Sequence, residues 1–158
     1  MSQENVKIVK AAIDAVNRGD LDAAFQDAAP GFEYDASRAV GPDRGIYGLD
    51  QARRNWEEFF ASWESFRVEP HEFIEVGDHV VVPGTARMVG RDGIEVEARV
   101  TLVWTIRNGA LERITMYQER QDALEDLGLS EQTLTPTPEP AGVRSGGFRR
   151  CSVRPGTG

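Results

Sequence analysis

Reactive sulfur and imidazole groups are scarce in this sequence. A single cysteine, Cys151, excludes an internal disulfide and suits a reducing compartment. No Cys-x-x-Cys pair, serine-nucleophile motif or glycine-rich phosphate loop occurs. The only histidines, His71 and His79, lack partner acids at a metal-ligand spacing. We therefore expect neither a metal site nor a cofactor.

Long apolar runs and excess positive charge are also missing. No stretch approaches the roughly 18 apolar residues of a membrane-spanning helix. The opening residues, MSQENVKIVKAAI, have helical periodicity and include Glu4, unlike a signal peptide. The formal net charge is −8, and an acidic surface repels phosphate backbones. We expect a cytoplasmic protein that binds neither nucleic acid nor membranes.

The first half of the chain contains helical periodicity. Apolar residues near the N-terminus recur three and four positions apart, which predicts a helix, and Gly19 suits its C-terminal cap. Asp20 is a candidate N-cap of a short second helix. A third helix is predicted over residues 49–63. Between them we expect a strand at residues 32–35 and a loop at 38–48.

The second half changes to a period of two. Four strands are predicted at Phe66–Val76, Val80–Val89, Ile94–Ile106 and Leu111–Arg120. Within residues 94–106 every even position is apolar, which indicates a buried face. The odd positions begin with charges such as Arg99 but continue as Thr101 and Val103. We interpret this outer face as covered by a second subunit in a homodimer. Helices followed by an antiparallel sheet indicate an α+β fold.

Periodicity stops near the C-terminus. Residues 130–158 hold four arginines among prolines and glycines. This composition is typical of a flexible tail, and a basic interaction arm is the alternative. Residues 1–129 are then the folded domain.

Four stretches carry a resemblance to a known family: AVNRGDLDAAF, GFEYDAS, WESFRVEPHEFIEVGDHVVV and LVWTIRNGALERITMYQERQDALEDLGL. Together they resemble the nuclear transport factor 2-like (NTF2-like) superfamily, in its SnoaL-like, polyketide cyclase-like branch. The resemblance implies a cone-shaped α+β barrel, with three N-terminal helices packed in a strongly curved mixed or antiparallel sheet around a deep apolar pocket. It also implies dimerisation through the outer sheet face. Isomerases, epoxide hydrolases, cyclases, dehydratases and binding proteins share this scaffold, so the fold leaves the reaction open.

Asp35 ends the strand in GFEYDAS, where isomerase relatives place a proton-shuttling aspartate. The resemblance makes Asp35 the candidate general acid/base. The alternative is a strand-end acid that caps the next loop through Ser37 or a backbone N–H. The oxyanion-hole positions of those isomerases correspond to Ala12 and Leu102, whose side chains cannot donate a hydrogen bond. Steroid-type isomerisation is therefore disfavoured.

Two functions remain open at this level. One is a cofactor-independent acid/base enzyme of isomerase, cyclase or hydrolase type, acting on a small apolar carbonyl or epoxide compound. The other is a non-catalytic ligand-binding or dimerisation module of the same fold. The candidate ligand-binding residues share a position on a predicted inward face or at the pocket mouth: Tyr34, Trp56, Phe59, Phe60, Trp63, Leu102, Trp104, Met116 and Gln118.

Overall fold

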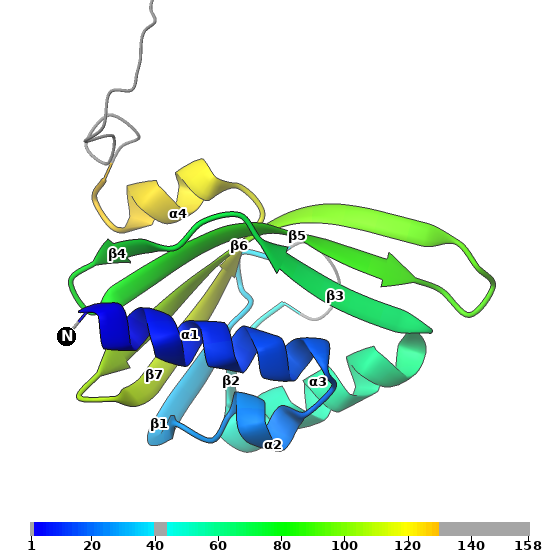
Figure 1. The fold of residues 1–158 in the computed structure, drawn as a ribbon, viewed down its shortest axis with the longest axis horizontal. Helices are drawn as coiled ribbons and strands as arrows, with labels where there is room; N and C mark the ends of the chain where they lie inside the picture. Colours follow the sequence, from blue (N-terminus) through cyan, green and yellow to red (C-terminus); the bar gives the residue numbers. More distant parts are fainter. Residues whose placement is uncertain (1, 40–43, 130–158) are drawn as a thin grey trace, which may run out of the picture. The chain divides into compact units, whose positions relative to one another are not determined.

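A computed structural model describes residues 2–39 and 44–129 (Figure 1). The chain divides into two compact units between Ala123 and Leu124. The expected tail, residues 130–158, lies outside the described residues. Within the described ranges, no helix combines the length and apolar character needed to cross a lipid bilayer.

Three helices precede or interrupt the first strands: α1 (Ser2–Asn17), α2 (Leu21–Ala24) and α3 (Leu49–Ser62). The end of α1 follows the sequence prediction, because Gly19 adopts a φ of 76° and the N–H of Asp20 reaches back to the carbonyl of Ala15 at 2.8 Å. The carboxylate of Asp20 then accepts from the N–H of Ala23 at 3.1 Å and caps α2.

One mixed sheet forms the rest of the first unit. Its strands are β1 (Ala28–Asp35), β2 (Ile46–Gly48), β3 (Ser65–Pro70), β4 (Ile74–Val76), β5 (His79–Val89), β6 (Glu95–Arg107) and β7 (Ala110–Tyr117). The order is β2-β1-β7-β6-β5-β3, and β4 also pairs with β5. Strands β1 and β7 are parallel, and the other pairs are antiparallel. The curved, unclosed sheet with helices on its concave side confirms the α+β prediction (Figure 1).

Several boundaries differ from the predictions. The strand predicted as Phe66–Val76 is two strands, because Pro70 has no N–H to donate and ends β3. Strand β1 begins at Ala28, before the predicted 32–35, and its register with β7 shifts between Ala28 and Glu33. Residues 46–48, predicted as loop, pair with β1 as β2. A fourth helix, α4 (Arg120–Asp126), follows β7 and was not predicted.

The two faces of β6 are both buried near its C-terminal half. The even positions contribute Leu102 and Trp104 to the core with α1. The odd positions Thr101 and Val103 are also buried within the single chain. The half-apolar sequence of these odd positions was a reason for expecting a partner subunit. The single chain already buries Thr101 and Val103, and the homodimer stays a prediction.

Candidate functional site

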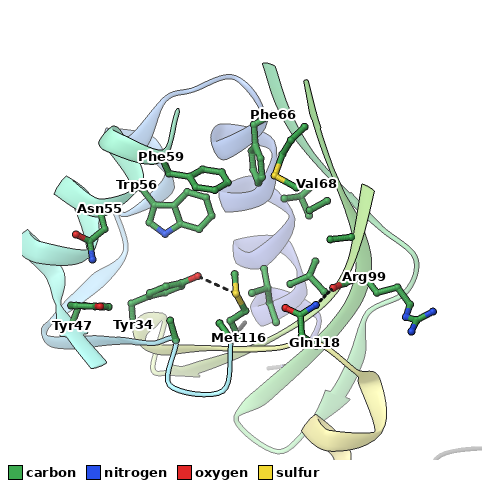
Figure 2. Close-up of a pocket in the computed structure, with 17 residues that line it drawn as sticks. Tyr34, Tyr47, Asn55, Trp56, Phe59, Phe66, Val68, Arg99, Met116 and Gln118 are labelled. Atoms are coloured by element: carbon green, nitrogen blue, oxygen red, sulfur yellow. Dashed lines mark hydrogen bonds between the residues drawn. The ribbon is translucent and has the colours of Figure 1, made fainter. Parts of the chain in front are cut away.

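A cavity of about 350 Å³ opens between α3 and the inner face of the sheet (Figure 2). Its lining is mostly apolar and comes from β1, β2, α3, β3, β5, β6, β7 and the segments that follow β1 and β7: Tyr34, Ala36, Ala39, Tyr47, Asn55, Trp56, Phe59, Phe66, Val68, Ala86, Met88, Ala98, Arg99, Val100, Leu102, Met116 and Gln118.

Small side chains on the sheet create this space. Ala86 of β5 pairs directly with Ala98 of β6, and both point toward the cavity. Gly84, two residues before Ala86, carries no side chain at all. A Cβ at Gly84 would lie 2.6 Å from the carbonyl oxygen of Glu69, so glycine permits the close approach of β3. Larger residues at the positions of Ala86 and Ala98 would fill the cavity.

Aromatic side chains form the opposite wall. Trp56 on α3 lies at the centre, with its ring centroid 6.0 Å from that of Tyr34. The same ring lies 5.6 Å from Phe59 and 5.8 Å from Phe66. These edge-to-face contacts stabilise the aromatic wall. A flat apolar molecule would meet ring surfaces on this side and alanines on the other.

The hydroxyl of Tyr34 is the polar group best placed inside the cavity. It lies 4.0 Å from the sulfur of Met116, a weak acceptor and its one partner among the described residues (Figure 2). Burial raises the pKa of Tyr34 well above its ordinary value. The phenol is therefore neutral at physiological pH and can donate a hydrogen bond to a ligand oxygen.

Polar residues gather where the cavity opens. Gln118 donates from Nε2 to the backbone carbonyl of Arg99 at 3.0 Å, while the Arg99 side chain points away from the cavity (Figure 2). Asn55 on α3 accepts from Gln51 at 2.8 Å and also lines the opening. These amides can orient a ligand at the mouth without placing a charge inside.

A smaller chamber of about 30 Å³ lies deeper, beside Tyr34 and Trp56. Trp104 contributes to its wall, and the indole N–H of Trp104 has no hydrogen-bond partner among the described residues. The rest of the chamber is apolar and comes from the helices and from inner positions of the sheet. The cavity thus narrows toward the hydrophobic core.

Asp35 does not line either chamber. Its Oδ1 accepts from the backbone N–H of Ser37 at 3.0 Å and from the Ser37 hydroxyl at 2.6 Å. Arg113 binds both Oδ2 of Asp35, at 2.5 Å, and the carboxylate of Glu33. Burial raises the pKa of Asp35, but the hydrogen bonds from Ser37 and Arg113 outweigh it and hold the pKa below its usual value. Its contacts are those of the loop-capping alternative, and its acid/base role stays a prediction.

The remaining sequence candidates divide between cavity and core. Tyr34, Trp56, Phe59, Leu102, Met116 and Gln118 line the main cavity, and Trp104 lines the inner chamber. Phe60 packs against the core, and Trp63 ends α3 with its ring 6.1 Å from Phe59; neither lines a chamber. The sequence analysis missed Ala86 and Ala98, although their even positions on the strands were a usable signal.

Among the described residues, no cluster of three or more histidine, cysteine or acidic side chains could hold a metal ion. Among the lining residues, the ionisable side chains of the main cavity are the phenols of Tyr34 and Tyr47, because the Arg99 side chain points away from it. Chemistry in this cavity therefore rests on neutral donors and on apolar contact.

Comparisons with known proteins agree with this architecture. An NTF2-like protein of unknown function from Burkholderia pseudomallei K96243 is 22% identical and aligns over 77% of this chain and 95% of its own, with a TM-score of 0.63. TerC, co-crystallised with polyporic acid, is 22% identical over 78% of this chain and 97% of its own, with a TM-score of 0.62. AclR from Streptomyces galilaeus is 13% identical over 81% and 98%, with a TM-score of 0.64.

These structural similarities show a shared fold, in which a curved sheet and helices make a cone-shaped α+β domain. No curated protein matches the chain in sequence. The family model of the SnoaL-like domain matches residues 9–114, from within α1 into β7. The chain therefore belongs to the SnoaL-like domain family.

Proposed function

We propose that this protein binds a planar, mostly apolar carbonyl compound in the main cavity, with the Tyr34 hydroxyl as hydrogen-bond donor. The observation that carries the proposal is the buried phenol of Tyr34, whose one described partner is a sulfur at 4.0 Å. Burying a hydrogen-bond donor without a good acceptor lowers the stability of the folded protein. A ligand oxygen at this point would accept a hydrogen bond from Tyr34 and displace only the weak contact to sulfur.

The walls favour a flat ligand. Trp56 and Phe59 present ring surfaces on one side, and Ala86 and Ala98 leave space on the other. Apolar surfaces on both sides stabilise an aromatic body by removing it from water. TerC was co-crystallised with polyporic acid, so that compound belongs in a first set of probes.

Binding, rather than acid/base turnover, agrees best with the described lining. A neutral Tyr34 can polarise a carbonyl, but proton abstraction also needs a base within hydrogen-bond reach of the substrate. Asp35 is held by Ser37 and Arg113 outside the cavity. We therefore expect a bound carbonyl compound to be recovered chemically unaltered, and a converted product would instead assign catalysis to this cavity.

The test compares fluorenone with fluorene, which has the same tricyclic shape but no carbonyl. Both compounds are titrated against the wild type and Tyr34→Phe by calorimetry or by quenching of tryptophan fluorescence. We expect fluorenone to bind the wild type roughly fivefold more tightly than fluorene, the worth of one hydrogen bond of about 1 kcal/mol. Tyr34→Phe should remove this preference and leave fluorene affinity unchanged.

Tyr117→Phe is the matched control, because Tyr117 is a buried tyrosine that does not line the cavity. This variant should retain the preference for fluorenone. The proposal is contradicted if neither tricycle binds, or if Tyr34→Phe keeps the wild-type preference.

A further inference from the structure

A second recess meets the main cavity at the free edge of β6. Strand β5 pairs with β6 along residues 95–105, but β7 pairs with β6 only from Thr101 onward. Within the described pairing, residues 95–100 therefore have a strand on one side only. Gln118 covers part of this edge by donating to the carbonyl of Arg99 at 3.0 Å.

The recess has a volume of about 360 Å³ and lies at the outer face beside this edge. It shares Ala98, Arg99 and Gln118 with the main cavity. Alternation along β6 explains how both chambers reach the same strand, because Ala98 faces inward while its neighbours face outward. The Arg99 side chain accordingly points away from the cavity in Figure 2.

The lining of the recess is polar, in contrast to the main cavity. Thr85, the cross-strand neighbour of Arg99, and the carboxylates of Glu97 and Glu119 complete its wall. Arg99 donates to Glu119 at 2.8 Å, and Glu97 is paired with Arg87 outside the recess. Each charge therefore already has an opposite partner.

Because these charges are already paired, the recess favours a neutral ligand group over a charged one. A charged group would have to displace an existing ion pair, whereas neutral hydroxyls can share spare lone pairs of a carboxylate and spare N–H groups of a guanidinium. Both glutamates and Arg99 keep such capacity, because the side chains of Glu97, Glu119 and Arg99 are 58%, 52% and 76% exposed. Hydroxyl groups are thus the fitting partners.

We propose that the two chambers form one bipartite site for an amphiphilic ligand. The planar carbonyl body occupies the main cavity, and a neutral, hydroxyl-bearing arm such as a sugar or polyol passes over the β6 edge at Gln118 into the recess. This inference rests on the proposed function, because the body must bind before the arm can reach the recess.

Hydroxyfluorenone and its O-glucoside test the inference, with the cyclohexyl ether as an arm of similar size without hydroxyls. The three ligands are titrated against the wild type, Arg99→Ala and Arg107→Ala. Arg107 is the matched control, an outward arginine of β6 that pairs with Glu112 at 2.7 Å away from the recess. Arg99→Ala keeps the backbone carbonyl that Gln118 binds.

The glucoside should bind the wild type about fivefold more tightly than hydroxyfluorenone, or more, as expected for one or more net hydrogen bonds. Arg99→Ala should remove this gain and leave hydroxyfluorenone affinity within about twofold. Arg107→Ala should retain the gain, and the cyclohexyl ether should show none that depends on Arg99.

The inference is overturned if the glucoside binds no better than hydroxyfluorenone, or if Arg99→Ala keeps the wild-type gain. Failure of hydroxyfluorenone itself to bind would contradict the proposed function instead. The two ideas therefore fail in different measurements.

Discussion

Nη2 of Arg113 lies 2.5 Å from Oδ2 of Asp35, across the parallel pair of β1 and β7. The same guanidinium binds Glu33, so one arginine bridges two carboxylates on the outer side of the sheet. The Asp35 side chain is 11% exposed, and the ion pair holds the start of the loop after β1. This relationship decides what removal of Asp35 should do.

Asp35→Asn should lower the free energy of unfolding at neutral pH by about 1–3 kcal/mol, because a charge-assisted hydrogen bond is lost. Fluorenone affinity should be unchanged. Since the folded-state pKa of Asp35 is lowered, its contribution is present above the unfolded pKa near 4 and is lost as pH falls through the folded pKa. Urea unfolding at several pH values measures how the free energy of unfolding depends on pH. The variant should show a weaker dependence than the wild type. Loss of ligand binding in a folded Asp35→Asn protein would instead place the carboxylate in the site.

Ala98→Leu should fill the cavity. The added carbons project from β6 into the space beside Ala86, so we expect fluorenone affinity to fall at least tenfold. Stability should be maintained or rise by about 0.5–2 kcal/mol, as cavity filling commonly gives. Ala61→Leu, on the exposed side of α3, is the control and should bind like the wild type. Unchanged affinity in Ala98→Leu would mean that the ligand lies elsewhere.

Tyr34 should make the fold sensitive to alkali. Burial raises its folded-state pKa, so its contribution to stability is complete below the unfolded pKa near 10 and is lost as pH rises above it. Stability measured by urea unfolding should therefore decline above about pH 10 in the wild type and less steeply in Tyr34→Phe. The ultraviolet absorbance change that the wild type shows and Tyr34→Phe lacks should appear only with unfolding. Ionisation of Tyr34 in the folded protein near pH 10 would refute this expectation.

Gly84→Ala should destabilise the sheet by about 1–3 kcal/mol, because the new Cβ would lie 2.6 Å from the Glu69 carbonyl oxygen. Thermal or urea unfolding measures the loss. Gly31→Ala is the control, since no atom lies within 4 Å of a Cβ at that position. Equal stability of the two variants would show that β3 can move away from β5 without cost.

Local patterns in the sequence identified much of the fold. Spacings of three and four predicted the first and third helices. Alternation predicted the core-facing side of β6 correctly from Val100 onward, but the prediction was wrong at the start of this stretch, where Ile94 and Val96 are exposed. Turn residues were equally informative: Asn108 and Gly109 adopt φ values of 53° and 78° and close the β6–β7 hairpin as expected. Short elements such as β2 and α4 were not predicted, because a few residues show too little periodicity.

The sequence by itself determined the first and third helices, the long strands and the core-facing side of the C-terminal half of β6, since each depends on residues close together in the chain. Only the tertiary structure decided where Asp35 points, because its partner Arg113 lies 78 positions away. The cavity was also a tertiary result. Small residues such as Ala86 and Ala98 leave a hollow only when register places them side by side, and alternation along one strand cannot reveal the register between two.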